Sequence, residues 1–238
     1  MFFVSLSKPS REQEAAVCRK GQSGGFNYGC PGASQRAPPL PESVDREGWW
    51  AVDHQRIKIG YGRKTYAATK DLLSSWGQFQ LPWAAVAADT PLEAGGPVCV
   101  AANVFGLWTA VPLQLLYKQE GNWREGAAAG GGRGGKRRHG RAFSYACGCL
   151  STHYLAGEER FKVEWDKTDD SVWYDILTYS RPAHPLAFLG YPVVRALQGR
   201  FRSDSARSVA RAAALGAVER SMDAKTRARL AAAESLED

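Results

Sequence analysis

Two neighbouring strands are encoded in residues 157–182, GEERFKVEWDKTDDSVWYDILTYSRP. Side chains in residues 159–165 alternate with the period of a strand, which puts Arg160, Lys162 and Glu164 on one face and Glu159, Phe161, Val163 and Trp165 on the other. Residues 171–180 are apolar or aromatic on both faces, which predicts a central strand that a helix covers on one side. The short spacing between the two strands indicates an antiparallel meander.

Working outward, the same reading gives the order of the other elements. A capping-box pattern, Ser10 with Gln13, predicts a short helix that ends near Arg19. A helical period is expected in residues 63–76, and a long C-terminal helix is expected from Pro192 onward. Further strands are predicted at residues 49–59, 83–88, 98–104, 111–117 and 142–149.

The charge of the chain is concentrated in one segment. The formal net charge is +7, and residues 124–141 hold six basic residues against Glu125, so the rest of the chain is nearly neutral. This distribution argues against specific nucleic-acid binding, which needs a basic stripe on a structured face. Residues 126–140 are Gly-rich, and we expect a disordered basic loop inserted between two strands. Weak contact of this insert with an anionic surface is the alternative.

Cysteine usage bears on the compartment and on metal binding. Five cysteines, an odd number, predict reduced thiols in an intracellular compartment, and no disulfide framework. The pair Cys147 and Cys149 lacks the spacing of a zinc knuckle, so no metal site is expected, and no motif calls for a cofactor. The first residues lack the features of a secretion signal.

The uncharged stretch at residues 94–117 has the length of a membrane span, but it is not expected to be one. Pro97, Gly106 and Pro112 interrupt it, and its two halves have the length and composition of strands. We therefore expect two buried strands and no transmembrane segment.

Five residues are candidates for a binding or catalytic site. Glu159 shares a face with apolar side chains, so its carboxyl group must pair with a base or have a raised pKa. His153 precedes that strand and could act as an acid or base near Glu159, or pack in its turn. Trp165 and Tyr174 could line a pocket or belong to the core. Arg181 could pair with Glu159 or Asp175, or bind an anionic ligand group.

Several motifs resemble the plant and bacterial family called DUF1990, over nearly all of residues 1–211. They are Gly24-Gly25-Phe26-Asn27-Tyr28, Phe143-Ser144-Tyr145, Gly157-Glu158-Glu159-Arg160-Phe161, Val172-Trp173-Tyr174-Asp175-Ile176, Ser180-Arg181-Pro182 and Gly190-Tyr191-Pro192. The basic insert and the Cys147-Gly-Cys149 sequence depart from the family pattern. Because the plant-type resemblance begins at the first residues, it implies that the N-terminus belongs to the fold and is not a cleaved transit peptide. The resemblance supplies no catalytic residues, since the family has no established activity.

The element order is similar to that of the helix-grip proteins of the Bet v 1 and lipid-transfer type. We therefore expect an α+β fold, a curved antiparallel sheet wrapped around a long C-terminal helix and a cavity. Residues 1–211 are expected to form a single domain, with residues 212–238 as an Ala/Arg-rich helical or disordered tail.

The leading functional hypothesis is a soluble protein that binds an apolar or amphipathic small molecule between the sheet and the C-terminal helix. In it, Trp165 and Tyr174 form the wall, and His153, Glu159 and Arg181 orient the ligand. An enzyme on the same scaffold, a hydrolase or cyclase-like catalyst with His153 and Glu159 as acid and base, is the alternative. A third hypothesis is an interaction module that acts through the basic insert. The cytosol is the expected compartment, with a plastid as the alternative.

Overall fold

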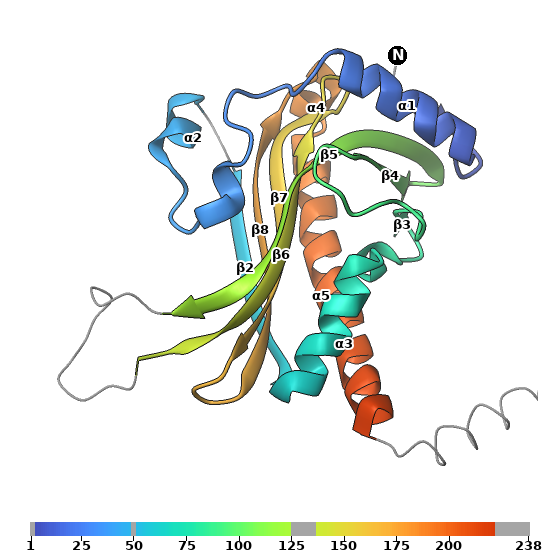
Figure 1. Cartoon of the computed structure of the whole chain (residues 1–238). Coiled ribbons are helices and arrows are strands. Elements are labelled where there is room, and N and C mark those ends of the chain that lie inside the picture. Colours follow the sequence, from blue (N-terminus) through green and yellow to red (C-terminus); the bar gives the residue numbers. More distant parts are fainter. Residues whose placement is uncertain (1–2, 49–50, 125–136, 222–238) are drawn as a thin grey trace, which may run out of the picture.

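A computed structural model describes residues 3–48, 51–124 and 137–221, and one antiparallel sheet is its centre (Figure 1). The strand order is β2-β8-β7-β6-β5-β4-β3, and β1 pairs with β5 beyond this path. The bounds are β1 Phe3–Ser5, β2 Ala51–Tyr61, β3 Ala84–Ala85, β4 Pro97–Val104, β5 Leu107–Arg124, β6 His139–Cys149, β7 Leu155–Asp166 and β8 Ser171–Pro182.

Helices and helical turns occupy both sides of this sheet. They are α1 Arg11–Ser23, η1 Ala33–Arg36, α2 Glu42–Arg46, α3 Gly62–Ser74, η2 Gly77–Phe79, α4 Pro185–Leu189 and α5 Tyr191–Ser221. The capping box at Ser10 is confirmed, because its side chain accepts from the Gln13 backbone N–H and the Gln13 side chain accepts from the Ser10 backbone N–H. The helix continues past Arg19 to Ser23. Gly21 does not end the helix but lies within it, where it packs closely against the side chain of Pro112.

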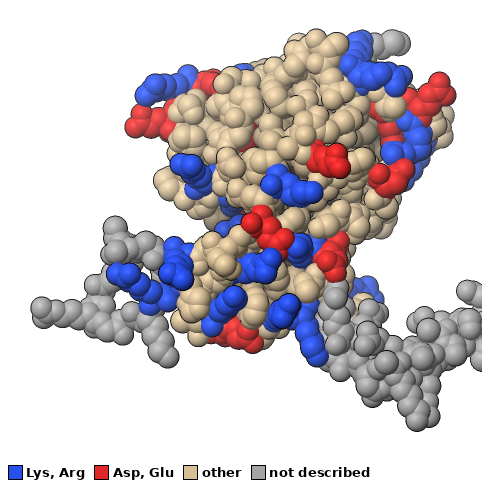
Figure 2. Space-filling model, viewed as in Figure 1, with Lys and Arg blue, Asp and Glu red and all other residues tan. Residues whose placement is uncertain are grey.

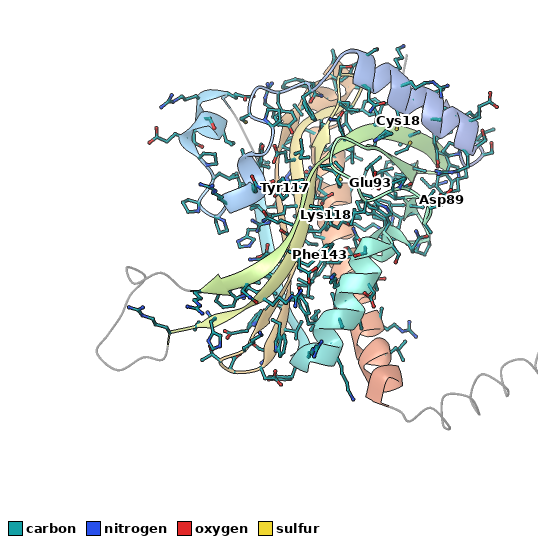
Figure 3. All side chains as sticks on the ribbon, in the orientation of Figure 1. Cys18, Asp89, Glu93, Tyr117, Lys118 and Phe143 are labelled. Carbon is teal, nitrogen blue, oxygen red and sulfur yellow. The ribbon has the colours of Figure 1, made fainter. Side chains whose placement is uncertain are left out.

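Other parts of the chain pack against both faces of the sheet. The inner face is the one toward α3 and α5, which pack against each other; the outer face carries the N-terminal segment, residues 26–47 (Figure 1). Tyr117 and Phe143, both labelled in Figure 3, mark the two faces: the Tyr117 hydroxyl lies 3.0 Å from the Ser34 hydroxyl, and Phe143 is part of the inner core. The expected fold, a curved antiparallel sheet around a long C-terminal helix, is confirmed.

Aromatic rings are a large part of the inner core. Trp76, Tyr145 and Phe161 are fully buried, and the rings of Phe79 and Phe201 lie 4.9 Å apart between the sheet and α5. Such ring pairs supply most of the apolar area that holds the helices to the sheet. The strand-to-helix connection depends on Gly60 and Gly62, whose φ values of +150° and +83° suit glycine.

Two expectations about the strands need correction. The expected strand at residues 83–88 is only Ala84–Ala85. The expected disordered insert, residues 124–141, is too long, because β5 runs to Arg124, which is in register with His139 at the start of β6. Arg138, the residue before β6, forms an ion pair of 2.6 Å with Asp166, so this residue of the expected insert is also held by the fold. Residues 125–136 lie outside the described residues.

Basic side chains near this end of the sheet are matched by acidic ones. Arg141 and Lys70 both pair with Glu120, at 2.9 and 2.5 Å. Figure 2 shows charges of both signs close together on the lower part of this face, whereas the centre of the upper part is largely uncharged. The described part of the sheet end therefore carries no uniform basic stripe.

The last helix continues beyond the expected domain. The helix α5 runs through residue 211 to Ser221, so the first part of the Ala/Arg-rich segment, expected to be helical or disordered, is helical. Residues 222–238 lie outside the described residues. Within the described part of the chain, no helix is both long and apolar enough to cross a membrane.

Candidate functional site

A row of side chains crosses the inner face where four strands are in register. Asp53 of β2 is opposite Thr178 of β8, Thr178 is opposite Glu159 of β7, and Glu159 is opposite Cys147 of β6. Because directly opposed residues of antiparallel strands point to the same face, these four side chains share one side of the sheet. The row lies next to the aromatic core, because the core residue Phe161 is two positions after Glu159 in β7.

Glu159 is the acidic group at the centre of this row. Burial raises its pKa from 4.5 to about 7, although a hydrogen bond from Thr178 and the charge of Arg202 act in the opposite direction. The Thr178 hydroxyl donates to Glu159 Oε1 at 3.3 Å. As a residue, Glu159 is nevertheless only partly buried. A raised pKa is one of the two outcomes that the sequence allows for a carboxyl group on an apolar face, the other being an ion pair with a base.

Two arginines of α5 meet the single carboxylate of Asp53. Arg195 donates from Nη1 to Asp53 Oδ2 at 2.6 Å and from Nη2 to Oδ1 at 2.8 Å. Arg202 Nη1 lies 3.0 Å from Asp53 Oδ2. These contacts, with the Arg195 hydrogen bond as the main cause, lower the pKa of Asp53. Sequence reasoning missed this cluster, although Arg195 and Arg202 are two helical turns apart and so lie on one face of the helix.

A third polar contact connects α5 to the sheet. Gln198 Nε2 donates to the Ser180 hydroxyl at 2.9 Å, and Gln198 Oε1 accepts from Arg195 at 2.8 Å. Polar groups therefore hold the first half of α5 against β2 and β8.

Burial along α5 changes between its two halves. Leu197 and Phe201 keep accessible surface, whereas Ser205, Val209 and Ala213 on the same helical stripe are buried. The second half therefore closes the core, and the incompletely buried first half lies over the row that contains Glu159.

His153 lies in the turn between β6 and β7. Its Nδ1 accepts the backbone N–H of Leu155 at 2.9 Å, and burial lowers its pKa to about 4. Four residues of extended strand separate Leu155 from Glu159, about 13 Å at 3.3 Å per residue. The structure therefore does not bring His153 together with Glu159, and the ring belongs to its own turn.

The two aromatic candidates lie at different levels of the inner face. Tyr174 is buried, and its hydroxyl lies 2.9 Å from the Ser205 hydroxyl of α5. Trp165 is six residues beyond Glu159 in β7, where it packs near Tyr66 and donates from its indole nitrogen to Asp170 at 2.8 Å. Tyr174 thus joins sheet to helix, and Trp165 closes the far end of the core.

Arg181 points to the other side of the sheet. Ser180 faces α5, so the next residue of β8 faces outward, where Arg181 forms an ion pair of 3.8 Å with Glu47. The expectation that Arg181 pairs within the protein is met by Glu47 of the N-terminal segment. It does not share a face with Glu159, so the expected partnership with that carboxyl group is wrong.

A second polar cluster, which sequence reasoning also missed, lies buried on the outer face. Glu158 accepts the Tyr28 hydroxyl at 3.0 Å, the Gly32 N–H at 2.5 Å and the Ser34 N–H at 3.0 Å. Arg160 donates to Asp175 at 2.7 Å and to the Ser34 carbonyl at 3.1 Å. These bonds hold residues 26–47 on the sheet, and both terminal nitrogens of Arg160 donate within the protein.

The remaining reactive side chains are the cysteines and the groups that could bind a metal ion. All five cysteines are free, and burial raises the pKa of both Cys147 and Cys149 beside Glu159. In residues 3–48, 51–124 and 137–221, no group of three or more His, Cys, Asp or Glu side chains is placed to hold a metal ion.

Comparisons with known proteins agree on one family. A family model described as "Domain of unknown function (DUF1990)" matches residues 33–208. The chain is 37% identical over 215 residues to the UPF0548 protein At2g17695 of Arabidopsis thaliana, an alignment that covers 88% of this chain and 97% of that protein. It is 29% identical over 168 residues to a UPF0548 protein of Dictyostelium discoideum, covering 68% of this chain and 72% of the relative.

Among solved structures, one similar chain is a START superfamily protein from Mycobacterium smegmatis. The TM-score is 0.38 at 11% sequence identity, and the match covers 67% of this chain and 94% of that one.

Proposed function

The chain belongs to the DUF1990 family, and from that premise we propose that it binds an apolar or amphipathic small molecule between its sheet and the first half of α5. The family has no assigned activity, so the proposal depends on the geometry of this chain. The ligand would lie over the row of Asp53, Thr178, Glu159 and Cys147, with the aromatic core beneath it.

The observation that carries this proposal is the state of Glu159. A carboxyl group that is desolvated enough to have a pKa of about 7 belongs inside the protein, yet Glu159 is only partly buried. Leu197 and Phe201 of α5 are likewise incompletely buried opposite the sheet. A protein core normally packs such groups away from water, and apolar surface with a few polar groups is typical of ligand sites.

The five residues singled out from the sequence receive different roles in this proposal. Glu159 orients the ligand, and Tyr174 supports the wall through its contact with Ser205. Trp165 stabilises the far end of the core. His153 shapes its turn, and Arg181 holds the N-terminal segment through Glu47. Thr178, Gln198 and Arg202 join the site as polar contacts.

Native mass spectrometry of the purified full-length chain, compared with its denatured mass, tests the proposal. We expect an added mass that is lost on denaturation, or binding of the apolar probe 1-anilinonaphthalene-8-sulfonate by the ligand-free protein. Gln198→Trp places a large ring in the space next to Ser180 and should abolish both signals. Ser203→Trp, on the exposed side of the same helix, is the matched control and should keep them.

The opposite result would be a clean mass with no probe binding, or equal binding by both tryptophan variants. Either result would contradict the proposal that the protein binds a ligand in this space. Thermal unfolding of both variants confirms that the comparison is made between folded proteins.

The other two hypotheses find less support. An acid and base pair of His153 and Glu159 would need the two side chains near one substrate, and about 13 Å of strand separates Glu159 from the turn of His153. The basic insert that would carry an interaction module lies mostly in residues 125–136, outside the described residues. As further proposals, we keep one domain over residues 1–211 and a reducing intracellular compartment, the latter because all five thiols are free.

A further inference from the structure

We infer that the ligand carries an anionic head group, which Arg202 binds while Glu159 holds a proton. This inference rests on the proposed function and specifies its ligand class, an amphipathic anion taken up together with a proton. It follows from the count of charged groups that meet between β2, β7, β8 and α5.

Asp53 is shared unequally by the two arginines beside it. Arg195 takes both carboxylate oxygens of Asp53 with hydrogen bonds of 2.6 and 2.8 Å, the bidentate geometry that suits a guanidinium group. Arg202 approaches Asp53 with Nη1 alone, 3.0 Å from Oδ2, and this buried nitrogen has no hydrogen-bond partner of good geometry in the described part of the chain. Its guanidinium group is therefore a cation with unused donors, and its side chain is 17% exposed.

Glu159 faces groups from each element packed around it. Its charged neighbours are Arg202 of α5 and Asp53 of β2. Its titratable neighbours are Tyr145, Cys147 and Cys149 of β6 and Tyr174 of β8. Burial raises the pKa of each of these four, so they stay neutral near pH 7.

The net charge of the site depends on one proton. With Asp53 ionised and both arginines charged, the site carries one net positive charge when Glu159 is protonated and none when it is ionised. A buried uncompensated charge is costly, so the protonated form of the site favours an anionic partner over an empty space. Arg202 and the Glu159 hydroxyl both donate hydrogen bonds, which is what the oxygens of a carboxylate, sulfonate or phosphate group accept.

The surroundings of these groups require an apolar portion in the same ligand. Phe201 is one residue from Arg202, and its ring packs on Phe79 at 4.9 Å and near Phe161 at 6.2 Å. Leu155 lies on β7 above Glu159 and is partly buried against the same core. A small inorganic anion would leave this apolar surface uncovered, whereas an alkyl or ring portion would bury it.

Calorimetric titration of the full-length protein with decane-1-sulfonate and 1-decanol tests the inference. The sulfonate stays ionised throughout the titration range, so any pH dependence belongs to the protein. With a pKa of about 7 at Glu159, sulfonate affinity should fall about tenfold from about pH 6 to about pH 8. Titrations in buffers of different ionisation enthalpy should show proton uptake on sulfonate binding near neutral pH.

Three variants separate the roles of the residues. Glu159→Gln should bind the sulfonate equally well across the range, without proton uptake, because an amide cannot titrate. Arg202→Gln should lose about tenfold or more in sulfonate affinity at every pH and keep its affinity for decanol. Arg207→Gln removes the same charge from α5 at a side chain that is 77% exposed, and it should behave like the wild type.

The possible results discriminate between the inference and the function on which it rests. Decanol binding without tighter sulfonate binding, or a pH dependence that persists in Glu159→Gln, would overturn the anionic head group and leave the binding function standing. Equal sulfonate affinity in Arg202→Gln and Arg207→Gln would do the same. Absence of binding for both probes would overturn the proposed function itself.

Discussion

Glu158 and Glu159 are consecutive residues of β7, and their carboxyl groups lie on opposite faces of the sheet in opposite surroundings. Glu158 accepts three hydrogen bonds from residues 28, 32 and 34 on the outer face. Glu159 accepts one, from Thr178 at 3.3 Å, on the inner face, where burial raises its pKa to about 7. One carboxylate therefore anchors a segment of the fold, and its neighbour is the group that the proposed ligand would contact.

We predict that Glu158→Gln destabilises the protein by about 2 to 4 kcal/mol at neutral pH, because charge-assisted hydrogen bonds weaken and the new amide NH₂ faces N–H donors. Urea denaturation measures the change, and limited proteolysis should cut within residues 26–47 faster. Glu159→Gln is the matched control, since it leaves the outer face unchanged. Equal losses in the two variants would show that Glu158 is not the anchor.

The second prediction concerns the pH dependence of stability. The pKa of Glu159 is higher in the folded protein than its ordinary 4.5, so the folded state binds more protons between pH 4.5 and about 7, and stability falls as the pH rises through that window. Glu159→Gln removes this loss, and its stability relative to the wild type should rise with pH by up to about 3 kcal/mol. Denaturation of both proteins from about pH 5 to about pH 8.5 measures the difference. A constant difference would contradict the raised pKa.

Much of the fold is predictable because strands and helices leave local patterns. The alternation that places Glu159 beside Phe161 and Val163 holds in the structure, where both apolar side chains are fully buried. The long C-terminal helix is equally visible, because its apolar stripe repeats every three to four residues. These features depend on neighbours within a few positions, so one sequence is enough to find them.

The parts that escaped prediction depend on residues far apart in the chain. Asp53 and Arg195 are 142 positions apart, so no local pattern reveals their ion pair. Arg160 is almost fully buried in spite of its charge, because residues 34 and 37 supply backbone acceptors from the N-terminal segment. Charged strand faces normally indicate solvent, and the Gly/Pro-rich segment that covers this one has no periodicity to predict its position.

A third prediction follows from the partly buried imidazole of His153. Burial lowers its pKa to about 4 from 6.5, so the unfolded state binds more protons, and stability should fall as the pH drops from 6.5 toward 4. His153→Asn keeps an acceptor for the Leu155 N–H and cannot be protonated, so it should lose less stability over this range. NMR titration of the ring and urea denaturation at several pH values check the two parts. A ring that titrates near its ordinary pKa would refute the prediction.

The last prediction concerns Gly157, the first residue of the Gly-Glu-Glu sequence in β7. Its φ is +134°, and a Cβ atom there would collide with the backbone carbonyl oxygen of Tyr179 in the adjacent strand. Gly157→Ala must therefore strain the backbone or push β8 away at the point where Ser180 meets α5, and we expect a loss of about 3 kcal/mol or more in unfolding free energy. Gly121→Ala, in open space within β5, should change stability by less than about 1 kcal/mol and serves as the control. Because the strain lies next to the Gln198–Ser180 contact, Gly157→Ala should also weaken decanol binding at temperatures where the variant remains folded. A variant as stable as Gly121→Ala would show that β7 and β8 can separate here without cost.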